Sequence, residues 1–472
     1  MTFSWQFVID LGILGSALLF ATWLRSKVRF LQKYLIPNSL TAGFILLPFY
    51  NWVFPLLGLG TGSLENIVYH FLNLSFIANA LRISKTKRQS NRDVFSTSVL
   101  VVAQYAIQCF FGTLITIILI KTIMPDLFPG FGLFATLGYS LGPGQAFAIG
   151  KGWETFGFSG LGSVGLTFGA IGFIIASFGG IFLINYGIRK GWVSSRELEG
   201  LNSKVVRSGV IKRNEKPIKE EVRDASSPEA IDPMSLNVSL VVFTYLAAYL
   251  ILIGITKLLS LLGSPGVQLS TNLWGIMFIF SAMTALLVKT ILISLKIDHI
   301  IDNARMTRVI GFSVDFMVAA AIAAISIAVV ASYWLPIVII AVVVGAITFV
   351  THLWLSSRIF QNHVFFRMIL VFGVATGTLP TGLALLRVID PEFETPASSD
   401  YTFASGLSFL AVIPILLTAN MPAKGAMNGS LTPTWIVFGI YAAYLVVLFI
   451  LYLILSGRRR FKNPSAVWLR RK

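Results

Sequence analysis

The stretch ATLGYSLGPGQAFAIGKG, from Ala135 to Gly152, lies between two long apolar runs and is the most unusual segment of this chain. It holds five glycines, one proline and a single charge. It is too interrupted for a helix that crosses a bilayer, and it is too apolar for an ordinary surface loop. The question it raises is which environment can hold a broken but apolar backbone.

The composition of the whole chain points to a membrane. The 472 residues are 56% hydrophobic and 12% charged, and their mean hydropathy is +0.80. A soluble protein cannot cover that much apolar surface, and apolar runs of about 18 to 25 residues predict membrane-spanning helices. We expect eleven spans, at residues 5–24, 36–57, 64–81, 95–120, 157–187, 236–262, 273–295, 309–332, 335–357, 400–420 and 432–456.

The positive charge follows the predicted topology. The net charge is +17 at pH 7, and 32 of the 37 basic residues fall in segments that lie inside if the N-terminus is outside. Arg358 and Arg367 are counted among them. This positive-inside pattern predicts a multi-pass membrane protein with a cytoplasmic C-terminus and no nucleic-acid partner. We expect its membrane to be a bacterial-type inner (plasma) membrane. The basic tail fits the same explanation, with binding of anionic lipid as a weaker alternative.

One polar segment divides the chain into two similar halves. Residues 188–234, with ten basic and eight acidic side chains, are expected to form a cytoplasmic linker. It separates a first membrane repeat (1–187) from a second (235–425), and residues 426–472 add an extra span and a tail. In each half, four spans precede a short segment rich in glycine and proline, and a further span follows.

The two broken segments, residues 131–152 and 364–391, enter from opposite sides of the membrane in this topology. Interrupted hydrophobic segments at matching positions of two halves are typical of inverted-repeat transporters. We therefore predict an all-α fold of about eleven spans, in which two inverted five-helix repeats each contain a re-entrant hairpin. The alternative is that the glycines only let helices pack closely.

An unpaired backbone group in hydrocarbon costs several kcal/mol, so such breaks are tolerated only inside protein or beside a polar cavity. Freed carbonyl groups suit Na⁺, and exposed helix N-termini favour a carboxylate. The breaks therefore predict a site for a cation and an organic anion.

Several stretches resemble the sodium/glutamate symporter family. They are VRFLQKYLIPNSLTAGFILL (28–47), FIANALR (76–82), AQYAIQCFFG (103–112), the first broken segment, and GTLPTGLALLRVIDP (377–391). The resemblance spans both halves and implies sodium-coupled uptake of glutamate, a homodimer, and a substrate-carrying core that moves against a scaffold. The sequences YSLGPGQ and TGLALLRVIDP depart from the family pattern at the hairpins, which leaves the exact substrate open.

The candidate ligands are polar or small residues at the breaks and inside the spans. The expected substrate-binding residues are Gly142, Gly144, Gln145, Thr378, Thr381 and Arg387. The expected Na⁺ ligands are Ser140, Thr376, Asp315 and Asn79. Structural alternatives remain for three of these, because Asp315 can pair with Arg308, Asn79 can bond between helices, and Arg387 can bond Asp390.

The expected partners are Na⁺ as the coupling ion, L-glutamate or a similar small carboxylate, and the bilayer. A proton-coupled carrier, a carrier of another organic anion and a channel are the alternatives. No enzyme is expected, because HExxH and P-loop patterns are absent and the nearest GxSxG match, from Gly157, ends at Leu161. The single cysteine, Cys109, excludes an internal disulfide.

Overall fold

The computed structural model describes residues 5–34, 36–83, 91–192, 230–261, 263, 270, 273–390, 395–459 and 461–469. Over these residues the chain is helical and contains no strand, which confirms the all-α prediction. Ten helices in the described ranges are long and apolar enough to cross a membrane, as in a multi-pass membrane protein. The predicted linker, 188–234, lies mostly outside the described residues.

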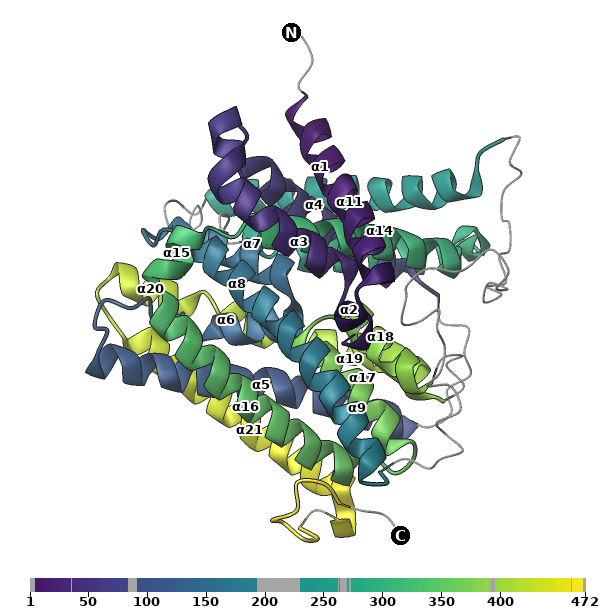
Figure 1. Cartoon of the computed structure of the whole chain (residues 1–472), viewed down its shortest axis with the longest axis vertical. Coiled ribbons are helices and arrows are strands. Elements are labelled where there is room, and N and C mark those ends of the chain that lie inside the picture. Colours follow the sequence, from purple (N-terminus) through teal and green to yellow (C-terminus); the bar gives the residue numbers. More distant parts are fainter. Residues whose placement is uncertain are drawn as a thin grey trace.

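The helices follow the order expected from the apolar runs (Figure 1). The first half contains α1 (Gln6–Lys27), α2 (Arg29–Lys33), α3 (Asn38–Pro48), η1 (Phe49–Val53), η2 (Phe54–Leu57), α4 (Gly62–Leu81), α5 (Asn91–Thr122), α6 (Leu133–Thr136), η3 (Leu137–Leu141), α7 (Pro143–Glu154), α8 (Leu161–Ile174), η4 (Ile175–Gly179) and α9 (Gly180–Arg189). The second half contains α11 (Pro233–Ser260), α13 (Met277–Ser294), α14 (Asn303–Ala323), α15 (Ile327–Ser332), α16 (Trp334–Ile359), α17 (Val364–Thr376), α18 (Leu379–Ile389), α19 (Ala397–Thr418), α20 (Met421–Met427) and α21 (Thr432–Ser456).

The predicted span at 64–81 forms α4, but α4 is not among the ten strongly apolar helices. Its sequence includes Glu65, His70, Asn73 and Asn79, which lower its hydropathy. Because α13 and α14 pack along it, protein neighbours rather than lipid surround much of this helix. Asn73, for example, is buried and accepts a hydrogen bond from Ser281 of α13 at 2.8 Å.

The predicted span at 309–332 is wrong at both ends. Helix α14 begins six residues earlier, because the Asp302 carboxylate caps the amides of Ala304 and Arg305 at 2.8 and 3.4 Å. It ends at Ala323, and Ser326 caps the separate helix α15. Asp315 therefore lies about 18 Å along α14 rather than close to its start.

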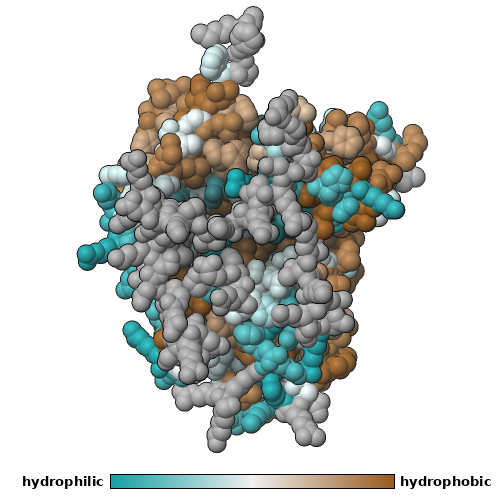
Figure 2. All heavy atoms as spheres, turned by 90° about the vertical axis from the view of Figure 1, so that its right-hand side faces the viewer, coloured by the Kyte–Doolittle hydropathy of each residue, from teal (hydrophilic) through white to brown (hydrophobic). Residues whose placement is uncertain are grey.

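Six helices, α1, α3, α4, α11, α13 and α14, form the upper group in Figure 1. Within it, α3 packs on α14 of the other half, and the corresponding helix α13 packs on α4. Large apolar side chains of α1 and α11, such as Leu19, Phe20, Phe243 and Leu250, are exposed. Figure 2 shows apolar surface over the upper part of the molecule, as expected for helices that face lipid.

The lower group consists of α5 to α9 and α16 to α21, and in it α5, α16 and α21 run side by side (Figure 1). Its inner packing includes a buried ionic cluster. The Arg367 guanidinium of α17 lies 2.5 Å from the Asp400 carboxylate of α19 and 3.4 Å from the Asp93 carboxylate of α5. The cluster therefore ties three helices together at one end of the group.

Candidate functional site

The first broken segment is a helical hairpin buried inside the protein. Helices α6 and η3 lead to Gly142, and α7 returns along them, so that the Phe134 and Trp153 rings lie 5.0 Å apart. Gly142 has φ +99° and ψ 168°, a conformation that side-chain-bearing residues rarely adopt. Residues 131–140 and 142–150 are all buried. The turn at Gly142 is therefore the tip of this hairpin.

The second broken segment folds back in the same way. Helices α17 and α18 meet at a break formed by Gly377 and Thr378. Their backbones touch where two glycines face each other, because a Cβ atom added to Gly373 would lie 2.7 Å from the Cα atom of Gly382. This tip is more accessible than the first, since Thr378 is half-buried and Pro380 is exposed.

The two hairpin tips touch each other. A Cβ atom added to Gly142 would lie 3.0 Å from the Thr378 Cγ2 atom. The Ser140 hydroxyl lies 2.9 Å from the Ala375 carbonyl oxygen, so that a side chain of the first hairpin bonds the backbone of the second. Segments more than 200 residues apart in the chain thus meet at one point.

A glutamine of α5 completes this contact. The Gln108 Oε1 atom lies 2.6 Å from the Ser140 hydroxyl, and the Gln108 Nε2 group donates to the Ala375 carbonyl at 3.0 Å. It also approaches the Thr348 hydroxyl of α16 at 3.2 Å. The Ser140 hydroxyl has one proton and faces two acceptors, so the tip contact is rich in uncharged oxygen atoms. Such hard oxygen donors suit an alkali cation.

Two buried polar side chains near the tips have unmet hydrogen-bonding capacity. Gln104, one helical turn from Gln108, has no partner for either amide atom, and the Ser177 hydroxyl of η4 has none among the described residues. The methyl group of the adjacent Ala176 faces Gly377, which places η4 beside the second tip. Unpaired buried polar atoms are costly, so both side chains offer hydrogen-bonding groups to a ligand bound beside the tips.

Five of the six predicted substrate-binding residues lie at the facing N-termini of α7 and α18. The Gln145 Oε1 atom points toward Gly142, and the Thr378 and Thr381 hydroxyls lie 3.4 Å apart. Gly144 faces the upper group, since an added Cβ atom would lie 2.9 Å from the Met317 Sδ atom. Two helix N-termini with nearby hydroxyl and amide groups favour an anion.

Of the other predicted residues, Ser140 and Thr376 lie at the tips, whereas Asp315, Asn79 and Arg387 lie outside this contact. Asp315 is exposed on α14 beside Ser39, and Asn79 is exposed on α4. Arg387 is exposed near the C-terminal end of α18, about 13 Å along the helix from Thr378. Thr376 is buried close to the tips, and its hydroxyl donates to the Phe372 carbonyl at 2.8 Å.

Sequence reasoning missed the contribution of α5 to the tip contact. Gln104 and Gln108 stand at i and i+4 in an apolar run, which indicates one shared helix face. That spacing does not say what the face touches. The contact of Gln108 with Ser140 and Ala375 needs three segments from distant parts of the chain.

A polar cavity of about 170 Å³ lies between the first hairpin and the upper group. In it, the Lys151 ammonium lies 3.3 Å from the Glu65 carboxylate of α4 and 3.0 Å from the Glu154 carboxylate of α7. The Ser163 hydroxyl accepts from the Ser326 backbone amide at 2.6 Å. Of these contacts, the Lys151–Glu65 pair joins the hairpin to α4 of the upper group.

Comparison with known proteins gives no match to a protein-family model, a curated protein or a solved structure. The geometry of the hairpin tips is therefore the basis for assigning a function.

Proposed function

We propose that this protein is a secondary active transporter that couples Na⁺ to the uptake of glutamate or a related small amino or dicarboxylic acid. The observation that carries the proposal is the contact between the two hairpin tips, in which the Ser140 hydroxyl bonds the Ala375 carbonyl. Facing helix N-termini next to an uncharged, oxygen-rich contact match the needs of a carboxylate and a sodium ion.

In this proposal, Na⁺ binds the Ser140 hydroxyl, the Gln108 amide oxygen and the Ala375 carbonyl. Because these ligands come from both hairpins and from α5, bound Na⁺ keeps the two tips in contact with each other. Thr378, Thr381 and Gln145 then receive the substrate carboxylate at the N-termini of α18 and α7. Binding of the ion thereby organises the substrate site, which is the coupling that symport requires.

The broader architecture is part of the same proposal. We infer that the hairpins are re-entrant and that the two halves are inverted repeats, since α3 on α14 and α13 on α4 are equivalent pairs. The lower group would carry the substrate and move against the upper group of a homodimer in a bacterial-type plasma membrane. One Na⁺ moving down a potential of 100 mV supplies about 2.3 kcal/mol.

The direct test is labelled L-glutamate uptake into proteoliposomes that contain the purified protein. We expect uptake under an inward Na⁺ gradient and none when K⁺ or choline replaces Na⁺. Uptake driven by a pH gradient would identify H⁺ as the coupling ion in place of Na⁺ and would still support a transporter. Conductance without saturation would favour a channel, and no glutamate uptake by folded protein would remove glutamate as the substrate.

We expect Ser140→Ala to raise the Na⁺ concentration for half-maximal uptake at least about tenfold, because one ligand and the bond between the tips are lost. Thr378→Val removes a hydroxyl from the substrate site that bound Na⁺ organises, and through this coupling it is expected to act in the same direction. Thr402→Val, which removes an exposed hydroxyl of α19, serves as the matched control. An unchanged Na⁺ dependence in both tip variants, with normal melting temperatures, would contradict the assignment.

The Lys151–Glu65 contact must open if the hairpin moves away from α4. Because the Lys151 side chain is 50% exposed, the pair contributes about 1 kcal/mol or less, and Lys151→Gln should leave the melting temperature nearly unchanged. We expect a thiol reagent to label Ser163→Cys up to about fivefold faster in the Lys151→Gln background, since the cavity opens more often. Lys121→Gln, which removes an exposed charge of α5, should not change the labelling rate.

The single native cysteine, Cys109, is buried and adds little background to this labelling. Equal labelling of Ser163→Cys with and without Lys151 would show that the ion pair does not restrain the hairpin.

A further inference from the structure

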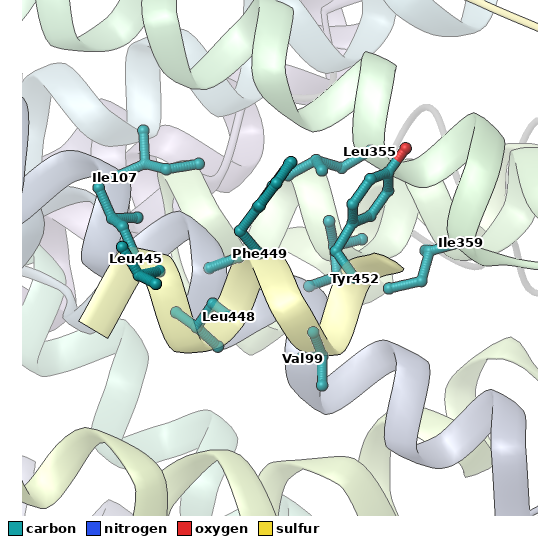
Figure 3. Close-up of a pocket in the computed structure, with 11 residues that line it drawn as sticks. Val99, Ile107, Leu355, Ile359, Leu445, Leu448, Phe449 and Tyr452 are labelled. Carbon is teal, nitrogen blue, oxygen red and sulfur yellow. The ribbon is translucent and has the colours of Figure 1, made fainter. Parts of the chain in front are cut away.

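A second cavity, which shares no lining residue with the polar one, lies between α5, α16 and α21. Its volume is about 360 Å³, and it is partly open to the surface. Figure 3 shows Leu448, Phe449 and Tyr452 of α21 around it, with Leu355 of α16 and Val99 of α5. The lining is almost entirely apolar, so the groove suits a hydrocarbon chain rather than a polar solute.

Two arginines stand at one end of this groove. The Arg92 guanidinium of α5 donates to the Leu455 carbonyl at 2.6 Å, one helical turn beyond Tyr452. The Arg459 guanidinium approaches the Phe360 carbonyl at 3.3 Å, next to the last residue of α16 that lines the groove. Arg92 is exposed and Arg459 is half-buried.

The charge at this end is not balanced by the described residues. The partners of Arg92 are the Leu455 carbonyl and the side-chain amide of Gln361, which are neutral, and neither Arg92 nor Arg459 forms an ion pair with a described carboxylate. Residues 456–472 contain no acidic side chain at all. An anion is therefore the missing counterpart, and arginine pairs well with phosphate.

We propose that this groove binds an anionic phospholipid of the leaflet next to the C-terminal tail. One acyl chain lies between α5, α16 and α21, and the phosphate group lies between Arg92 and Arg459. Lipid tails are as apolar as the groove, so the groove alone gives no preference for one headgroup. The arginines supply that preference, and the bound lipid fixes the extra helix α21 to the rest of the lower group.

The test uses the delipidated full-length protein in mild detergent, with native mass spectrometry and melting temperature as readouts. The probes are phosphatidylglycerol and phosphatidylcholine with identical acyl chains. We expect the protein to retain phosphatidylglycerol about tenfold better and to melt at a higher temperature with it. The double variant Arg92→Gln, Arg459→Gln should bind both lipids equally.

Two further variants distinguish the contribution of the lipid headgroup to binding from that of the apolar groove. Ala103 of α5 also lines the groove, so Ala103→Trp places a large ring in it and should reduce binding of both lipids. Lys462→Gln removes an exposed charge of the same tail and should leave the tenfold preference intact.

Equal retention of the two lipids by the natural protein would overturn the proposal, as would an unchanged preference in the double arginine variant. Conversion of a dimer to a monomer by Ala103→Trp would instead make this groove an interface between two copies. If Ala103→Trp does not fold, the arginine variants decide the question alone. Glutamate uptake is not needed for any of these readouts, so the result is independent of the proposed transport function.

Discussion

Replacement of Arg367 by methionine should lower the free energy of unfolding by about 3–5 kcal/mol. The side chain is buried between the carboxylates of Asp93 and Asp400, and its removal leaves two negative charges together away from water. The variant also loses the hydrogen bond that the guanidinium donates to the Asn362 carbonyl. We expect the melting temperature in detergent to fall by several degrees, or the protein to fail to accumulate in the membrane.

The destabilisation caused by unbalanced buried charge can be separated from the destabilisation caused by lost side-chain packing. In a triple variant that combines Arg367→Met with Asp93→Asn and Asp400→Asn, no charge remains in this cluster. Neutral replacement of a whole buried ion cluster is often tolerated, so this variant should regain much of the stability. Removal of an exposed arginine of the second half, in Arg308→Met, serves as the matched single control. If the triple variant is less stable than Arg367→Met alone, charge imbalance is not the cause.

The second large effect is expected at the tip of the first hairpin. Gly142→Ala should abolish Na⁺-driven uptake while the protein still folds. Its φ of +99° is unfavourable for alanine, with a strain of about 1–3 kcal/mol, and the new methyl group would lie 3.0 Å from Thr378 Cγ2. To relieve this, the tips must separate, and separation breaks the contact of Ser140 with Ala375.

Uptake into proteoliposomes and the Na⁺ concentration for half-maximal uptake measure this effect. Gly406→Ala on α19 is the matched control, because a Cβ atom there would meet nothing within 4 Å. It should transport as well as the natural protein, or slightly better if helix propensity raises its stability. Normal uptake by Gly142→Ala, with an unchanged Na⁺ requirement, would show that close contact of the tips is not needed for transport.

The sequence by itself predicted the helical membrane fold and the positions of both broken helices. These features are local, because a run of apolar residues predicts a span and glycine with proline predicts a break, whatever surrounds them. Helix ends were less predictable where the capping residue lies outside the apolar run. Asp302 begins α14 six residues before the predicted span, and Asp315 moves from the start of the helix to its middle.

Only the tertiary structure decided which polar groups meet. The sequence placed Arg367 among the basic residues of the inner loops, whereas the fold buries it against Asp93 and Asp400. It likewise brings Gln108 to Ser140 and leaves Asn79 exposed on α4. Hydropathy and helix breaks depend on neighbours in the chain, but a contact depends on the rotation and position of each helix. These are set by packing between residues hundreds of positions apart.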